Sequence, residues 1–190
     1  MVTLPTRPRP TLHGRTVVLR PIVEADARDM HASLADAETM RLTGTRRVYD
    51  LEEVRRHCAG LEERHDRVDL AICAADDGRW LGEVVLMDID AVDRTAGFRI
   101  ALAAERLAGR GYGREAARLL LAWGFDVLGL HRVGLEVYAF NPRAIHVYET
   151  LGFRHEGRLR EVLDQDGARH DALVMGLLAH ELVREGLGPA

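Results

Sequence analysis

The sequence predicts a single α/β domain with a mixed, mostly antiparallel, twisted sheet of about seven strands and flanking helices. Two observations lead to this fold class. Short β-branched segments and longer amphipathic segments alternate in the order strand, two helices, three strands, helix, strand, helix, two strands. The chain has 190 residues, 47% of them hydrophobic, which suits one domain with a sizeable core. We expect this domain over residues 16–185, after a loose proline-rich arm over residues 1–15.

The N-terminal half supplies the first strand, two helices and a run of three strands. The β-branched segment 16–20 predicts a strand, and the segment 24–34 predicts a helix. Asp50 followed by Glu53 is typical of a capping box, which predicts a helix over 51–65. The three strands that follow are expected over 68–74, 80–89 and 96–102.

The C-terminal half alternates helices with strands and ends in a hairpin. Apolar residues recur at helical spacing after a glycine-rich segment, which predicts a helix over 113–128. The residues of this apolar stripe are Ala116, Leu120, Trp123 and Val127. A strand over 131–138, a helix over 141–151 and two strands over 153–163 and 168–177 complete the domain.

Charge and cysteine content exclude several classes of protein. The net charge of −4 gives no general attraction to nucleic acid or to anionic membranes, so neither is expected as a partner. Cys58 and Cys73 lie outside any CxxC pair and follow no signal peptide, so we expect reduced thiols and a cytoplasmic protein. The nine histidines form no HExxH or CxxC…H pattern, and no metal site is expected.

Three alternating glycines, Gly109, Gly111 and Gly113, stand between a strand and a helix. Backbone N–H groups can approach an anion closely at such a turn, and a helix N-terminus favours negative charge. The turn is therefore a candidate phosphate site, with a flexible connector as the alternative. All 26 basic residues are arginine, so the lysine of a P-loop is missing. The GxGxG spacing also differs from the GxGxxG of a dinucleotide site.

The remaining phosphate-binding pattern is the R/Q-x-x-G-x-G/A turn of acetyltransferases that bind acyl-CoA. Two registers fit it, one over residues 106–111 and one over residues 108–113. The first matches every position, whereas the second lacks the leading Arg or Gln. We favour the second because it lies directly against the predicted helix, whose N-terminus supplies the anion site.

The start of the predicted helix over 141–151 contains a second group of candidate site residues. Asn141 is a good N-cap, and Pro142 falls at the first helical position, where a missing N–H has no cost. Tyr148 lies roughly 20° from Asn141 around the helix axis, and Ala144 lies near the same stripe. A slender ligand could run along this face with the phenol at its reactive end, although Tyr148 could also be an ordinary core residue.

Together these segments resemble the GCN5-related N-acetyltransferase (GNAT) superfamily, and most of all its RimJ/RimL-like branch. The stretch 109–161 follows the family pattern almost continuously, and it includes the LGF strand start at 151–153. The closing segment 166–178 also fits, and the segments TVVLRPIVEADA and LGEVVLMDID match more loosely. The resemblance covers residues 16–185 and implies the GNAT fold, with a sheet splayed near Leu102 and Val137 to admit the cofactor.

The resemblance implies acetyl-CoA as cosubstrate and assigns residues to it. The strand end is expected to pair with the pantetheine arm, the glycine turn to bind the pyrophosphate through backbone N–H groups, and the second helix to contact both. These residues are Ile100, Ala101, Leu102, Arg110, Gly111, Tyr112, Gly113, Arg114, Asn141, Arg143, Ala144 and Tyr148. Tyr148 is also expected to protonate the leaving thiolate as a primary amine attacks the thioester directly.

The general base and the acceptor are less well defined. Relatives often carry a glutamate near Phe98, where this chain has Gly97. Glu83 and Glu136 are the candidate bases, and deprotonation through water is the alternative. The acceptor could be a protein N-terminus or a small amine such as a polyamine, an amino acid or an aminoglycoside. A non-catalytic acyl-CoA-binding or regulatory module is the competing function. A homodimer is an open expectation, since homodimers are common in the superfamily.

Overall fold

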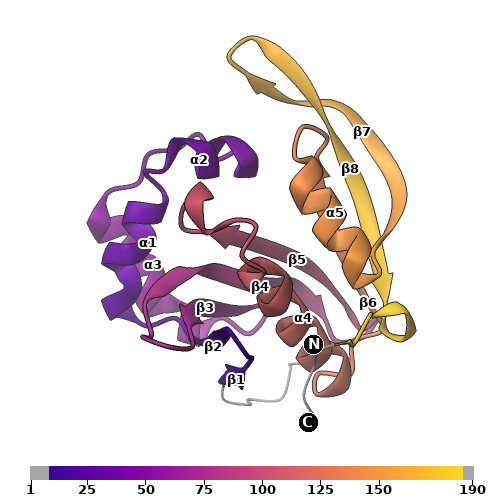
Figure 1. Cartoon of the computed structure of the whole chain (residues 1–190), viewed down its shortest axis with the longest axis horizontal. Helices are drawn as coiled ribbons and strands as arrows, with labels where there is room; N and C mark the ends of the chain where they lie inside the picture. Colours follow the sequence, from indigo (N-terminus) through magenta and orange to yellow (C-terminus); the bar gives the residue numbers. More distant parts are fainter. Residues whose placement is uncertain (1–8, 186–190) are drawn as a thin grey trace.

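The structure, a computed structural model, describes residues 9–185 apart from the side chain of Glu105. It is an open sheet of eight strands with helices on both faces (Figure 1). The strand order is β1-β2-β3-β4-β5-β6-β8-β7, and among residues 9–185 only the β5–β6 pair is parallel, which confirms the predicted class. The strands are β1 (Leu12–His13), β2 (Val17–Pro21), β3 (Val68–Ala74), β4 (Trp80–Asp90), β5 (Thr95–Leu102), β6 (Arg132–Tyr138), β7 (Arg154–Gln165) and β8 (Ala168–Leu178).

The additional strand, compared with the seven expected, is β1. Leu12 and His13 pair antiparallel with β2, so this part of the expected arm belongs to the sheet. Residues 1–8 of that arm lie outside the described residues. A strand of two residues is too short to show an alternation of polar and apolar side chains, which explains why the sequence did not predict it.

The helices agree with the predicted order, with one addition. They are α1 (Ala27–Ser33), α2 (Ala37–Thr43), α3 (Leu51–Gly60), α4 (Tyr112–Asp126) and α5 (Pro142–Leu151). The predicted capping box is present at α3, because the Asp50 carboxylate accepts from Glu53 N at 2.8 Å and Asp50 N donates to the Glu53 carboxylate at 3.0 Å. The addition is α2, for which we predicted no element. The predicted stripe on α4 is wrong at Val127, which follows the last helical residue and is 42% exposed.

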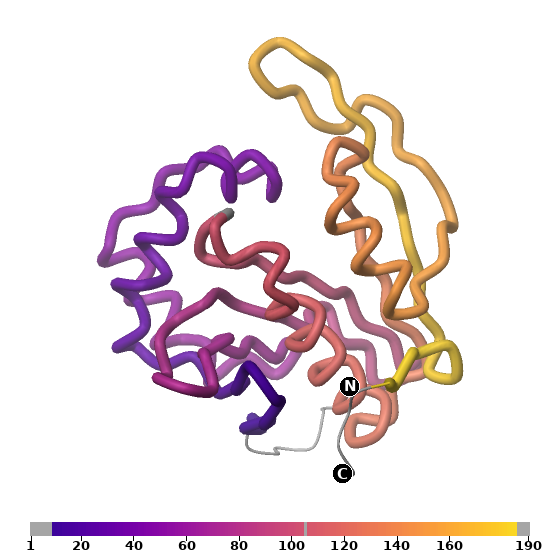
Figure 2. Tube along the Cα trace, viewed as in Figure 1, coloured from indigo at the N-terminus to yellow at the C-terminus, as the bar shows by residue number. Residues whose placement is uncertain are grey.

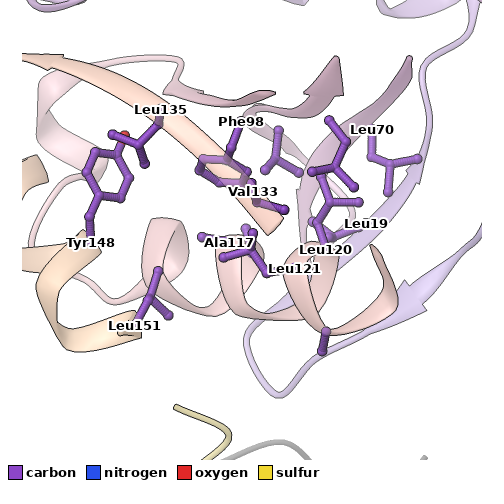
Figure 3. Packing of buried hydrophobic residues seen from close by; sticks show 14 of the residues in the cluster. Leu19, Leu70, Phe98, Ala117, Leu120, Leu121, Val133, Leu135, Tyr148 and Leu151 are labelled. Carbon is purple, nitrogen blue, oxygen red and sulfur yellow. The ribbon is translucent and has the colours of Figure 1, made fainter. Parts of the chain in front are cut away.

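The centre of the sheet is buried on both faces. Along β3, Leu70 and Ile72 point into the main core, where α4 packs (Figure 3). Ala71 and Cys73 point the other way, into a smaller core formed with α1 and α3. This alternation makes the whole of β3 buried and fixes the position of α4 over the strands that lead to the glycine turn.

The sheet opens between β5 and β6. These strands pair at three positions only, the last being Gly97 with Gly134. Beyond that point β5 pairs with β4 and β6 pairs with β8, each on its outer side. The predicted splay is therefore present, with residues 98–102 and 135–138 forming the two arms of a V.

The hairpin of β7 and β8 projects well beyond the rest of the sheet (Figures 1 and 2). Cys58 and Cys73 are both free and buried. Within residues 9–185, no helix has the length and apolar character needed to cross a bilayer.

Candidate active site

A cavity of about 990 Å³ opens at the V between β5 and β6. This volume lies at the upper end of the range for small-molecule sites, roughly 300–1,000 Å³, so it can hold a long ligand. The predicted site residues that line it are Ile100, Ala101, Leu102, Gly111, Gly113, Arg114, Glu136, Asn141, Arg143, Ala144 and Tyr148. Glu83, Arg110 and Tyr112 are the predicted site residues that do not line it. The fold thus brings together residues from β5, the glycine turn, β6 and α5.

The glycine turn owes its sequence to backbone conformation. Gly109 and Gly111 have φ angles of 75° and 85°, in the left-handed region that glycine adopts at little cost. An added Cβ would meet no atom of the described residues within 4 Å at either position, so crowding by these residues is not the reason for glycine. Gly113 is different, because an added Cβ would lie 3.8 Å from the side chains of Ile100 and Leu102. The start of α4 therefore packs directly on the end of β5.

This turn presents a row of backbone donors. Gly111 is the N-cap of α4, and the first helical hydrogen bond runs from Glu115 N to Gly111 O at 3.0 Å. The backbone N–H groups from Arg110 to Arg114 have no acceptor within the described part of the chain. Such N–H groups at a helix N-terminus form an anion site, and their position against α4 agrees with the register over 108–113.

Arginine side chains surround the same turn. A second cavity of about 510 Å³ shares Gly111 and Arg114 with the first, and Arg110 lines this second cavity. Its other arginines are Arg15 and Arg118, and the Arg118 Nε is buried without a hydrogen-bond partner among the described residues. Burial and the charge of Arg114 lower the pKa of Arg118. The region can therefore accept negative charge.

The side chain of Tyr112 lines neither of the two cavities. It is partly buried and packs against the main core, whereas its backbone N–H lies in the first turn of α4. The predicted contact of Tyr112 with a phosphate would have to use that backbone group.

The start of α5 forms the opposite wall of the cavity. The Asn141 Oδ1 accepts a hydrogen bond from Ala144 N at 3.1 Å, and Pro142 occupies the first turn, as the sequence predicts. Because the amide oxygen is used as the cap, the amide NH₂ of Asn141 is the group that a ligand could accept from. Asn141, Ala144 and Tyr148 all line the cavity, together with Arg143, His146, Val147 and Thr150 of the same helix.

Tyr148 is almost completely buried, with 8% of its surface exposed. Its ring meets Phe98 and Phe153 edge-on, at centroid distances of 6.2 and 5.7 Å. The hydroxyl end lies beside Leu135 of β6 (Figure 3), and it has no hydrogen-bond partner within the described residues. Burial raises the pKa of Tyr148 to about 12, so the phenol stays protonated at neutral pH and can donate a proton to a ligand.

The two candidate bases occupy different environments. Val133, Leu135 and Val137 of β6 point into the main core, so Glu136 lies on the opposite face of the strand, where it lines the cavity. Glu136 is exposed and has no hydrogen-bond or ion-pair partner among residues 9–185. Glu83 forms an ion pair with Arg99 at 2.7 Å and does not line the cavity. The structure thus places Glu136, and not Glu83, in one cavity with Tyr148.

One wall of the cavity, contributed by α2, was not predicted from the sequence. Glu38, Thr39, Leu42 and Thr43 of this helix line the cavity. The Thr39 hydroxyl donates to Leu102 O at 3.3 Å, and the Arg41 guanidinium lies 4.9 Å from the centre of the Phe140 ring. The residues that could have predicted α2 from the sequence are those that cap its two ends. Asp36 accepts from Thr39 N at 2.8 Å as the N-cap, and Gly44 ends the helix with a φ of 66°.

The face of the sheet around Glu136 was also missed. Met87, Gly97, Gly134, Tyr138, Ala172 and Val174 line the cavity there. These residues come from four strands, and their proximity depends on the register between strands, which a single sequence does not reveal. No group of three or more metal-binding side chains occurs within the described residues.

Comparisons with known proteins agree with this architecture. The acetyltransferase (GNAT) domain family matches residues 16–154. The chain is similar to spermidine N(1)-acetyltransferase of Escherichia coli, with 32% identity over 95% of this chain and 94% of that protein.

Solved structures give the same result. One is spermidine N-acetyltransferase from Vibrio cholerae in complex with CoA and spermine, with a TM-score of 0.81, 26% identity, and coverage of 87% of this chain and 97% of that one. A GNAT acetyltransferase from Bacillus anthracis, with a TM-score of 0.77, 18% identity and coverage of 90% and 100%, shares the fold.

The match to the family extends over well more than half of the chain, from the first long strand to the start of β7. The comparisons give no support to a non-catalytic module, and they do not single out the RimJ/RimL-like branch, which stays a prediction. The chain belongs to the GNAT acetyltransferase family and is an N-acetyltransferase that uses acetyl-CoA.

Proposed function

We propose that this enzyme acetylates a small polyamine such as spermidine, with Tyr148 as the acid and Glu136 as the group that receives the acceptor amine. The observation that carries the proposal is one cavity lined by both Tyr148 and Glu136, whose phenol and carboxylate have no hydrogen-bond or ion-pair partner among residues 9–185. The similarity to two spermidine acetyltransferases supports the choice of acceptor.

The donor side is proposed to hold acetyl-CoA, which supplies the acetyl thioester. The free N–H groups from Arg110 to Arg114 would bind the pyrophosphate, and nearby arginines would add positive charge. The open edge formed by Ile100, Ala101 and Leu102 would pair with the pantetheine arm, as the vacant side of the V allows. The amide NH₂ of Asn141 would donate to the same arm, while Arg143 and Ala144 complete this wall.

On the acceptor side, charge favours a cation. Glu38 pairs with Arg41 at 2.7 Å, and Arg99 is held by Glu83, so these charges are largely balanced. Glu136 is the carboxylate in this region without such a partner among residues 9–185. An ammonium group is therefore attracted to Glu136, which can take up its proton before the amine attacks the thioester. Tyr148 then protonates the departing thiolate.

The test is an acceptor panel with release of free CoA as the readout. We expect the wild-type enzyme to turn over spermidine or spermine faster than peptides with a free N-terminus. A higher rate with the peptides would instead favour a protein N-terminus as the acceptor. A homodimer also stays a prediction, which light scattering of the purified protein would test.

The role of Glu136 can be separated from that of Glu83. Replacing Glu136→Gln should lower kcat/KM for spermidine by about tenfold to a hundredfold, because a charge-assisted interaction of roughly 1.5–3 kcal/mol is lost. The KM for acetyl-CoA should stay the same. An unchanged kcat/KM for spermidine would remove Glu136 from the mechanism.

A further inference from the structure

Three glycines lie next to one another on the face of the sheet that carries Glu136. Gly97 of β5 is the register partner of Gly134 of β6, and Gly134 is the partner of Gly176 of β8. Residues directly opposite each other on neighbouring strands present their side chains to the same face. These glycines, here called the glycine row, therefore leave a strip of sheet without side chains at the point where the V closes.

The fold does not require glycine at positions 97 and 134. Neither residue has a positive φ. An added Cβ on Gly134 would lie 3.8 Å from the Arg132 guanidinium and 3.9 Å from Met175 O, which is ordinary contact. An added Cβ on Gly97 would lie 3.3 Å from Cγ of Met87, a flexible side chain that can move. Glycine weakens a strand interior, and it is often found where a ligand approaches the backbone.

Gly176 has a different role from the other two. An added Cβ there would clash with the side chains of Glu156 and Arg132, which form an ion pair at 2.6 Å across this end of the row. That ion pair covers the row at β8. The other end, over Gly97 and Gly134, opens into the cavity, where Met87 borders it. The glycine row therefore forms a hollow that is closed at Gly176 and open to the cavity at Gly97 and Gly134.

Two further groups connect this hollow with the reaction. Glu136 follows Gly134 by two residues along β6, so it lies on the same face, next to the open end. Tyr148 is more than nine-tenths buried, has no hydrogen-bond partner among the described residues, and lines the same cavity. A ligand that reaches Tyr148 and contacts Glu136 therefore has the hollow within reach.

We propose that the hollow over Gly97 and Gly134 holds the aliphatic part of an extended amine acceptor, and that these two glycines set the acceptor length that the enzyme accepts. This inference rests on the proposed function. The surroundings suit methylene groups, because the hollow is lined by backbone and by the thioether side chain of Met87, and its end is closed by a balanced ion pair. A side chain at either glycine would fill the space in which the aliphatic part of the acceptor binds.

The test is a comparison of acceptors of different length with Gly97→Ala and Gly134→Ala enzymes. We expect the KM for spermidine to rise about tenfold, because even a single methylene in a pocket changes discrimination by about that factor. The KM for a short monoamine and the KM for acetyl-CoA should change by less than about twofold. The matched control is Gly60→Ala, since an added Cβ there meets no atom within 4 Å and the residue lies at the end of α3.

A second measurement keeps the result interpretable. The melting temperature of Gly134→Ala should equal or exceed that of the wild type, because the added methyl makes only ordinary contacts. If the wild type acetylates spermidine and both variants keep its ratio of KM values for long and short amines, the hollow does not bind the acceptor, while the proposed function stands. If the wild type acetylates short monoamines but no polyamine, the proposed acceptor class is wrong and the length role of the glycines is rejected with it.

Discussion

The two sides of the cavity are built from different kinds of chemical group. The donor side, formed by the turn 109–113 and the start of α5, offers mainly backbone N–H groups and one capping amide. The acceptor side, formed by α2 and the face around Glu136, offers side chains and a glycine hollow. Backbone groups are held in place by helix geometry, whereas the acceptor side depends on the identity of each residue. The donor side should therefore respond to changes of backbone conformation, and the acceptor side to changes of side chain.

The largest effect is expected at Tyr148, which lies where the two sides meet. Replacing Tyr148→Phe should lower kcat by about a hundredfold or more, because general acid catalysis supplies roughly that factor. The KM for acetyl-CoA should change by less than about twofold, since the ring and its contacts with Phe98 and Phe153 remain. Steady-state kinetics with both substrates measures this split. An unchanged kcat would show that the phenol is not the acid.

The pH dependence sharpens the same prediction. The pKa of Tyr148 is raised to about 12 by burial, so the phenol stays protonated over the usual assay range. The wild-type rate should therefore rise as the acceptor amine loses its proton, toward an amine pKa of roughly 10, without a decline caused by Tyr148. A fall in kcat that begins near neutral pH and disappears in Tyr148→Phe would contradict the raised pKa.

A smaller effect is expected on the donor side. Replacing Gly111→Ala forces alanine into a φ of 85°, at a cost of about 1–2 kcal/mol, and it shifts the N–H groups that start α4. The KM for acetyl-CoA should rise by about fivefold to tenfold, a shift of about 1 kcal/mol, and the KM for the acceptor should stay the same. Gly78→Ala is the matched control, because Gly78 has a φ of 72° in a turn outside the cavity. Equal changes of KM in the two variants would show that lost stability alone explains the result.

The smallest effect is expected at Glu83, which is a candidate base from the sequence alongside Glu136. Replacing Glu83→Gln removes the partner of Arg99, an ion pair with one exposed member. Pairs of this kind contribute about 0–1 kcal/mol, so stability should change little and kcat/KM should stay within about twofold. A large loss of kcat/KM for the acceptor in Glu83→Gln would instead support Glu83 as the base.

The same contrast explains what a single sequence can predict. The donor side was predicted because its signals are local: alternating glycines before α4, and Asn141 with Pro142 before α5. These motifs fix the backbone within a few residues, so they can be identified without knowing which strands are neighbours. The structure adds a conformational reason for Gly109 and Gly111, because both have positive φ angles that glycine adopts at little cost.

The acceptor side depends on contacts between distant segments. Glu83 and Glu136 have similar sequence surroundings, and only the strand order and register show which of them lines the cavity. The helix α2 has no buried residue, so it lacks the apolar stripe from which helices are predicted. It is held instead by individual contacts, such as that of Arg41 with Phe140, which join residues almost a hundred positions apart.

The V between β5 and β6 also bears on how the protein avoids self-association. Past Gly97, the side of β5 that faces the V has no partner strand, so residues 98–102 present an unpaired strand edge. Exposed edges of this kind can template the pairing of strands from other copies and lead to aggregation. Here the edge lies inside a cavity walled by α2 and α5, where a slender substrate fits more readily than a strand with its side chains. The cavity that receives the donor thus also keeps the unpaired edge of β5 from pairing with strands of other copies.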